Sequence, residues 1–381
     1  MEAFSTLLQW LASATGDAAK TDSVPLDFPM PEVPLKAMRL SPTRPRDRFC
    51  CAMGQRLPQR SSLSLDPATL WNNPHTFRPR PDSFVGVPNP ATNLSDDGGT
   101  IGFVYTRHGG FIDLGHARDF IDYTRYFASM YRDVASKPEH RGDIKLFETG
   151  LVSTTAHVHL LAEQAASPPD FAICALLGAK LAFEFSVWHE IESYFTQEKY
   201  SSFAPEDLFS NAVGVVAGFR ALVYPTGSFD RSADSALKHV LELLDPRDIA
   251  TTEAATQYIK DHWWETTFLD PRPNTLRRNF LTPGAIKPWL VTDLAIPGLE
   301  AKAAELTQVI GKPQATSITI PTHYNGIFLE ERARLVFRNP LQEIKDLVPT
   351  ISEIRSIDLL TVSSRVRDLA RAQEGATIDQ P

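Results

Sequence analysis

The sequence predicts a mainly α-helical protein with a few short β-strands, an α+β fold built around one buried central helix. The first observation is the segment 174–195, in which apolar residues point in every helical direction, so that this helix belongs inside the protein. The second is an apolar repeat of three to four residues in several other segments. The third is that stretches rich in β-branched and aromatic residues, such as 101–106, are short.

Composition limits the class of protein. The 381 residues are enough for one large domain or two ordinary ones, and a hydrophobic content of 43% supports a substantial core. The net charge of −8 argues against broad nucleic-acid binding. Charged Lys180 and Glu184 interrupt the best candidate for a membrane span, so no transmembrane segment is expected. Adjacent Cys50 and Cys51, and Cys174, are interpreted as thiols, since no metal-binding spacing joins them.

The chain is expected to have three parts. Residues 1–45 comprise an N-terminal helix and a proline-rich linker, 46–230 a core domain with the site, and 231–381 a helical extension packed on that core. Strands are predicted at 101–106, 143–149 and 315–320. Besides the buried helix, helices are predicted at 116–134, 202–222, 236–244, 251–264, 299–310, 328–347 and 351–372, and helix is preferred for the ambiguous segment 153–166.

The buried helix carries polar residues that need partners, namely Glu184, His189, Glu190 and Glu192. An unpaired buried charge costs roughly 3 kcal/mol or more, so such groups are paired, hydrogen-bonded or bound to a metal. Two of these have a structural explanation: Lys180 and Glu184 are spaced to pair along the helix, and Glu192 lies near the helix end. His189 and Glu190 are therefore the residues that most require a site, although Ser193 breaks the H-E-x-x-H zinc-protease motif.

A second candidate segment is the glycine turn after the strand 101–106. His108 precedes Gly109 and Gly110, and Asp113, His116 and Asp119 follow at three-residue spacing, near one edge of a helix. Histidine and aspartate at such spacing are suitable ligands for zinc or iron. The alternative is structural, with Asp113 capping the helix and Asp119 pairing with a neighbouring arginine.

A third candidate segment is Pro205-Glu206-Asp207 with Asn211 one turn later. Asp207 and Asn211 are four residues apart and would face one cavity. The alternative is that proline and two acids simply begin a helix, where the macrodipole favours negative charge.

Weaker signals lie elsewhere. His157 and His159 would be two ligands on one face of a strand, although the segment also has a helical pattern. Arg272, Arg277 and Arg278 would hold an anionic group or form an exposed basic face. Asp261, His262 and the two tryptophans that follow are mostly packing residues. The sequence lacks a P-loop, a dinucleotide fingerprint and the kinase motifs, which disfavours nucleotide chemistry.

At these segments the chain resembles DUF4056, a family of uncharacterised bacterial proteins. The resemblance rests on the blocks 49–54, 105–119, 188–191, 203–211 and 288–291, which together cover roughly 45–295. The family pattern has serine where this chain has Ala204, which removes an expected helix cap. The resemblance implies a shared site, but it names no reaction.

The hypothesis from the sequence is a metal-dependent hydrolase of amide or ester bonds acting on a small molecule or peptide. His116, His189 and Glu184 would hold a divalent ion, with zinc expected and iron as the alternative. Glu190 would act as general base and Asp113 as a second catalytic group. The further candidates are His108, Asp119, Glu206, Asp207 and Asn211.

Two other hypotheses use the same residues. In one, the protein is a non-catalytic binding or scaffold protein, and the polar residues form a network that fixes helix packing. In the other, His189 and Glu190 act as a metal-free acid–base pair. A cytoplasmic location is expected, because the N-terminus lacks a basic region before its apolar stretch. Export is the alternative, since proteins of the DUF4056 family resemble lipoproteins.

Overall fold

The computed structural model describes residues 24–29, 103–135, 142–148, 154–160, 170–196, 198–266 and 273–381. The predicted N-terminal helix, most of the proline-rich linker and the Cys50–Cys51 pair lie outside these ranges. Within them the chain forms helices and short strands in small sheets, which confirms the predicted α+β class.

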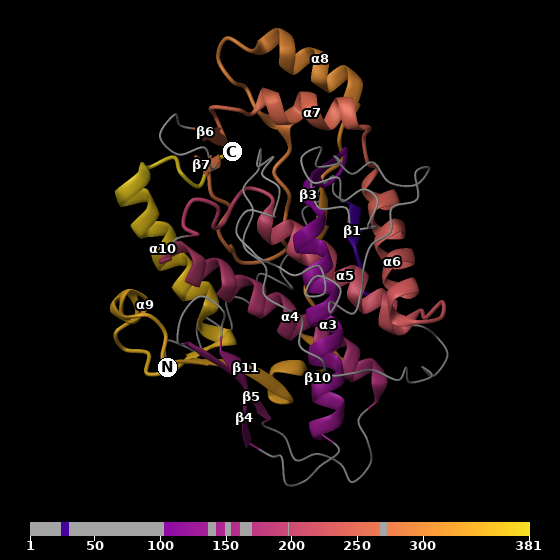
Figure 1. Ribbon diagram of the computed structural model, residues 1–381, viewed down its shortest axis with the longest axis vertical. Coiled ribbons are helices and arrows are strands. Elements are labelled where there is room, and N and C mark those ends of the chain that lie inside the picture. The colour runs from indigo at the N-terminus through magenta and orange to yellow at the C-terminus, as the bar shows by residue number, and fades with distance from the viewer. Residues whose placement is uncertain are drawn as a thin grey trace, which may run out of the picture.

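Three helices form the centre of the molecule: α3 (Leu114–Ala135), α4 (Phe171–Tyr194) and α5 (Asp207–Val223). They pack against one another, and other elements surround them (Figure 1). Helix α4 is long and apolar enough to cross a membrane, but 89% of its apolar 18-residue stretch is buried inside the protein. It is therefore the predicted buried helix at the core, and the carboxylate of Asp170 caps its first turn.

Glycines allow these helices to approach closely. A Cβ atom added at Gly214 of α5 would lie 2.2 Å from the carbonyl oxygen of Ala117 in α3. One added at Gly178 of α4 would lie 2.5 Å from the carbonyl oxygen of Thr124, also in α3. Both distances are too short for any residue with a side chain, so glycine sets the spacing between α3 and its two neighbours.

A four-stranded antiparallel sheet packs beside α4. Its order is β12 (Ile354–Arg355), β11 (Ala333–Arg338), β5 (Thr155–Leu160) and β4 (Gly142–Glu148). One face of β5 is apolar and joins the main core, because Ala156, Val158 and Leu160 alternate with polar residues. The ring of Trp188 in α4 stacks on Phe337 in β11 at 4.3 Å between centroids.

The remaining elements form the periphery. The hairpin of β2 (Phe103–Thr106) and β3 (Gly110–Asp113) leads directly into α3. Helix α6 (Phe229–Leu244) packs on α5, and α7 (Ile249–Tyr258) lies with α8 (Glu300–Ile310) at one end of the molecule (Figure 1). Helix α10 (Leu359–Glu374) packs on α4, with α9 (Gln342–Leu347) beside it. Short paired strands complete the fold: β1 (Val24–Leu26) with β8 (Thr316–Ile318), β6 (Trp264–Thr266) with β7 (Pro273–Thr275), and β9 (His323–Tyr324) with β10 (Ile327–Phe328).

Two predicted helices are wrong. The segment 153–166 contains strand β5, because its apolar residues alternate with polar ones and one face covers the core. The segment 328–347 contains β10, a short 3₁₀ turn, β11 and only then α9, because Ala333, Leu335 and Phe337 also alternate along a strand. Helix α7 ends at Tyr258, before the predicted end at 264, and the region before α5 forms turns from residue 198.

Strand β11 comes from the C-terminal part of the chain and pairs with β5 from the preceding part. The two parts thus share one sheet within the described structure. The division into a core domain and an extension stays a prediction from the sequence.

Replacement of Gly214 by alanine is expected to destabilise the protein by about 2 kcal/mol or more. The methyl group would push α5 away from Ala117, and this overpacking outweighs the gain of roughly 1 kcal/mol in helix propensity. Urea unfolding followed by circular dichroism measures the change. Ser235→Ala, at an exposed position of α6, is the control for helix propensity and should leave the stability nearly unchanged. A Gly214→Ala variant as stable as wild type would contradict this account.

Candidate functional site

Three segments distant in sequence bring polar side chains to one buried place. The β2–β3 hairpin ends at Asp113 and delivers His116 in the first turn of α3. The last turns of α4 carry Glu190, and the turns after residue 198 lead to Glu206 and Asp207 at the start of α5. All five residues are at most 4% exposed. The N-terminal ends of α3 and α5 both lie here, and their macrodipoles favour negative charge.

His116, Glu190 and Asp207 form the centre of this site. One ligand atom from each lies within 4.8 Å of the others, and Nδ1 of His116 is 3.4 Å from Oδ1 of Asp207. Imidazole nitrogen and carboxylate oxygens are ligands that zinc and iron accept. Within the described ranges, this is the group of histidine and acidic side chains whose geometry suits a metal ion.

Backbone N–H groups fix the two carboxylates. The amide of Phe203 donates to Oε2 of Glu190 at 2.7 Å, and the next amide, that of Ala204, donates to Oδ2 of Asp207 at 2.7 Å. Phe203 adopts a left-handed conformation with φ of 53°, which is unusual for a bulky residue and costs roughly 1–2 kcal/mol. This conformation directs two successive N–H groups at two different side chains.

The electrostatics of the centre favour protons or cations. Burial raises the pKa of Glu190 to about 7. Burial also raises the pKa of Asp207 well above its usual range, and the charges of Glu190 and Glu206 raise it further. No N–H or O–H donor among the described residues reaches Oε1 of Glu190. A hydrogen bond between Glu190 and Asp207 therefore requires a proton on one carboxyl group.

Asp113 and Arg278 support the centre from two sides. Oδ1 of Asp113 accepts the amides of Gly115 and His116, so Asp113 caps α3 as the structural interpretation predicted. Arg278 is buried, donates to the backbone oxygen of Ser202 and pairs with Glu374 of α10 at 2.8 Å. Its charge lowers the pKa of Glu190. Because Arg278 is buried and bonded to Ser202, it does not form an exposed basic face.

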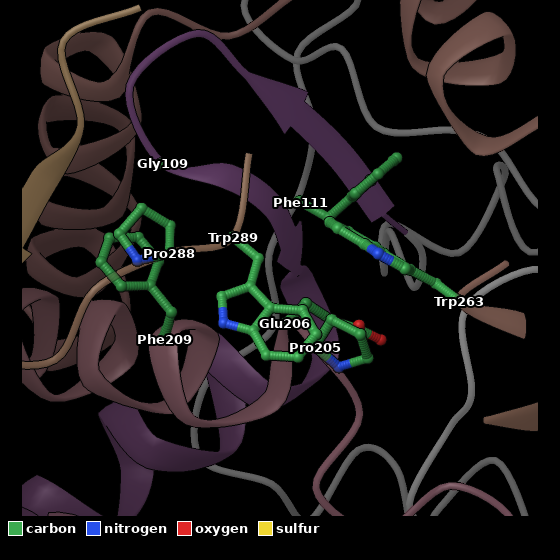
Figure 2. Close-up of a pocket in the computed structure, with 8 residues that line it drawn as sticks. All are labelled: Gly109, Phe111, Pro205, Glu206, Phe209, Trp263, Pro288 and Trp289. Atoms are coloured by element: carbon green, nitrogen blue, oxygen red, sulfur yellow. The ribbon is translucent and has the colours of Figure 1, made fainter. Parts of the chain in front are cut away.

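A narrow pocket opens onto the site at Glu206. It is lined by Gly109, Phe111, Pro205, Glu206, Phe209, Trp263, Pro288 and Trp289. Figure 2 shows Glu206 among the aromatic and proline side chains that line the pocket. Glu206 is the charged residue in this lining, and its carboxyl group is buried.

The structure places several predicted site residues elsewhere. Glu184 pairs with Lys180 at 2.5 Å, and Lys180 also contacts Glu330. His189 is half-buried and outside the three-residue group. His108 lies in the hairpin turn, where its Nδ1 accepts the amide of Gln314, and Asp119 lies 3.4 Å from Arg118. Asp113, Glu206, Asp207 and Asn211, in contrast, are all fully or nearly fully buried at the site.

The histidines at 157 and 159 lie on strand β5. Nδ1 of His157 is 2.8 Å from Asp143, and its Nε2 is 3.0 Å from the hydroxyl of Thr155. The first contact links side chains of β4 and β5, and the second lies within β5. His157 and His159 are not part of the group around His116.

Sequence reasoning missed three contributors. Glu198 is buried and its charge raises the pKa of Glu190, but it lies in a region predicted to join two helices without a motif. Trp263 and Trp289 line the pocket, but their pattern in the sequence indicates only packing. The contact between these tryptophans, at 5.7 Å between ring centroids, depends on tertiary structure alone.

Comparison with known proteins assigns the family. A family model described as "Protein of unknown function (DUF4056)" matches residues 42–291, more than half of the chain. The chain belongs to the DUF4056 family. The matched region of this DUF4056 protein contains the residues of the centre and of the pocket, from Gly109 to Trp289. No curated protein and no solved structure matches the chain.

The stability of chelator-treated protein is expected to fall as the pH rises from about 5 to about 7.5. The folded-state pKa of Glu190, about 7, is above the unfolded value of about 4.3. Folding therefore favours the protonated form of Glu190. The stability that this protonation contributes is fully present below the pKa of Glu190 in the unfolded chain, and it is lost as the pH rises through the pKa in the folded protein. The loss is on the order of 1–3 kcal/mol. Thermal melts across this range measure it.

The matched comparison is Glu190→Gln, which removes the titrating group and keeps the shape of the side chain. Its melting temperature should depend less on pH than that of wild type. Equal slopes in the two proteins would show that Glu190 does not titrate in this range.

Lys180→Met is expected to lower the free energy of unfolding by about 3–5 kcal/mol, because Glu184 and Glu330 would be left buried without their cation. Burial lowers the pKa of Lys180, but the charges of Glu184 and Glu330 raise it by more. The pKa of Lys180 is therefore above its usual value. Urea denaturation measures the loss. Adding Glu184→Gln and Glu330→Gln to the variant should restore most of it, and a loss below about 1 kcal/mol would refute the role of this ion-pair network.

Proposed function

We propose that this DUF4056 protein is a metal-dependent hydrolase of amide or ester bonds, with His116, Glu190 and Asp207 as the ligands of a divalent ion. The observation that carries the proposal is the convergence of these three buried side chains within 4.8 Å. Buried carboxylates this close repel each other unless a proton or a cation lies between them. Three protein ligands are typical of catalytic zinc sites, which keep a position open for water or substrate.

This proposal changes two roles expected from the sequence. Glu190 is a ligand instead of the general base, because it belongs to the three-residue group. Asp207 replaces His189 and Glu184 as a proposed ligand, since Glu184 already pairs with Lys180 and His189 is outside the three-residue group. Zinc is the expected ion because one ligand is a histidine, and iron is the alternative.

The ion would supply a Lewis acid that polarises the substrate carbonyl and lowers the pKa of a water to about 7. The amides of Phe203 and Ala204 hold Glu190 and Asp207 in place for this task. In the reaction, water oxygen adds to the carbonyl carbon, the bond to the leaving nitrogen or oxygen breaks, and the leaving group takes a proton. The substrate would enter through the pocket at Glu206.

A metal-free reaction is the second candidate, and one observation favours it. Glu190 and Asp207 lie within hydrogen-bonding reach, and burial raises the pKa of both. Two carboxyl groups that share one proton can act as acid and base without a metal. Activity that survives chelation would select this candidate. Chelator-insensitive stability with no activity would select the scaffold hypothesis.

A cytoplasmic location and a small-molecule or peptide substrate complete the proposal. Both rest on the sequence, and the aromatic and proline lining of the pocket supports an apolar group near the bond that is cleaved.

His116→Ala is expected to abolish binding of the proposed ion. Protein purified without an affinity tag should contain at least one equivalent of zinc or iron by elemental analysis, and removing the imidazole should deplete it, because it is one of three protein ligands. His189→Ala is the matched control and should retain the ion. Circular dichroism establishes that both variants fold. Metal-free wild-type protein that also fails to bind added zinc would exclude the proposal.

A further inference from the structure

One peptide group lies between Arg278 and Glu190. Nη1 of Arg278 donates to the carbonyl oxygen of Ser202, and the N–H of the same peptide group, that of Phe203, donates to Oε2 of Glu190 at 2.7 Å. A trans peptide group is planar, so its C=O and N–H point in opposite directions and rotate together. The contact that fixes the oxygen of Ser202 therefore also fixes the direction of the N–H that reaches Glu190.

The next peptide group repeats this arrangement. The backbone amide of Asn279 donates to the carbonyl oxygen of Phe203 at 2.8 Å, and the amide of Ala204 donates to Oδ2 of Asp207 at 2.7 Å. Two consecutive residues, Arg278 and Asn279, thus hold the oxygen atoms of two consecutive peptide groups, whose N–H groups reach two carboxylates. The left-handed backbone of Phe203 joins these groups, so it is restrained on both sides.

Arg278 is held in a fixed orientation for its contact with Ser202. The residue is 2% exposed, and Nη1 also donates to the hydroxyl of Ser202 at 3.1 Å. Nε donates to Glu374 of α10 at 2.8 Å, and the guanidinium carbon lies 5.3 Å from the centre of the Tyr194 ring. Because a guanidinium group is planar and its N–H directions are fixed, these partners together limit its rotation.

The charge of Arg278 also strengthens the bond that Glu190 accepts. A cation that donates to a carbonyl oxygen polarises the peptide group and makes its N–H a better donor, by roughly 10–30% for each bond in such a chain. Oε2 of Glu190 is occupied by this bond, whereas no donor among the described residues reaches Oε1. The orientation of the Ser202–Phe203 peptide group therefore determines where Oε1 of Glu190 points.

We infer that Arg278 is a positioning residue for Glu190, which it orients through the Ser202–Phe203 peptide group, and that Glu374 of α10 holds Arg278 in place. The inference rests on the proposed function for its effect on the ion, but not for its effect on the carboxylate. Residues whose partners orient a metal ligand typically change metal affinity 10- to 100-fold when they are replaced, so about this effect is expected of Arg278.

The first test observes the peptide group itself in metal-free protein. Serine precedes phenylalanine at 83–84, 202–203 and 228–229, so labelling with carbonyl-¹³C serine and ¹⁵N phenylalanine gives three correlations in an HNCO spectrum. Ser202→Ala identifies the correlation of interest by removing it. Arg278→Met should move the Ser202 carbonyl carbon and the Phe203 amide proton upfield together, because both hydrogen bonds weaken. The correlation of Ser228 with Phe229 is the internal control and should stay in place.

A Phe203 amide proton that stays in place while the Ser202 carbonyl carbon moves would overturn the inference. Glu374→Gln keeps the arginine and weakens only its orientation, so it serves as a second variant if Arg278→Met does not fold. It should move the same two nuclei in the same direction by a smaller amount. An unchanged spectrum in Glu374→Gln would overturn the role of Glu374.

The second test measures affinity for Zn²⁺ by competition with a chromophoric chelator. Arg278→Met should bind Zn²⁺ about 10- to 100-fold more weakly than wild type. Arg278→Lys keeps the charge and a donor, so it should recover part of this loss. Arg277→Met removes the neighbouring charge, which has no contact with Ser202, and should bind Zn²⁺ as wild type does.

The two tests separate the inference from the proposed function. Wild-type affinity in folded Arg278→Met would overturn the positioning role and leave the three proposed ligands intact. Wild-type protein that binds no Zn²⁺ would overturn the proposed function, and the shift of the Phe203 amide proton would then decide on its own whether Arg278 positions Glu190.

Discussion

Burial of negative charge at one point is the constraint on which the rest of this structure depends. Asp113, Glu190, Glu206 and Asp207 lie together in the interior with His116. Such a group exists only if the fold compensates it. The chain does so with two helix N-termini, two directed backbone amides and the charge of Arg278. The amides and the N-terminus of α5 come from one segment, and the N-terminus of α3 and Arg278 come from two others. The topology around α3, α4 and α5 can be understood as the means of bringing these contributions together.

The compensation requires accurate helix positions. Gly214 lies in α5 two turns after Asp207, and its contact with Ala117 is one residue from His116. The distance between these helices therefore also sets the distance between two of the central side chains. The contact between Gly214 and Ala117 therefore determines both the packing of α3 against α5 and the geometry of the site. The ion pairs around Lys180 have a different task, because they lie on α4 toward Glu330 and anchor the C-terminal part of the chain.

Sequence reasoning predicted the residues of the site better than their roles. The buried helix, the glycine turn and the acids before α5 each have a local pattern, so the sequence predicts as candidates the three residues that converge and the buried residues near them: Asp113, His116, Glu190, Glu206, Asp207 and Asn211. Their partners were not, because pairing depends on contacts between segments. Glu184 and His189 were grouped with His116 only because they share a helix with Glu190, and a helix directs adjacent side chains about 100° apart. The sequence predicts helices where strands β5 and β11 lie, because short strands give a weak local signal and depend on pairing with each other.

The left-handed Phe203 links completion of the site to the order in which the chain assembles. Such a conformation persists only where surrounding structure imposes it. The surroundings come from far along the sequence: the amide of Asn279 donates to the carbonyl oxygen of Phe203 at 2.8 Å, and the ring of Phe280 lies 4.7 Å from its ring. A nascent chain that has not yet reached Phe280 contains every central side chain but lacks this restraint. A part of the chain that keeps both contacts to Phe203 therefore extends at least to Phe280, as does the region shared with the family.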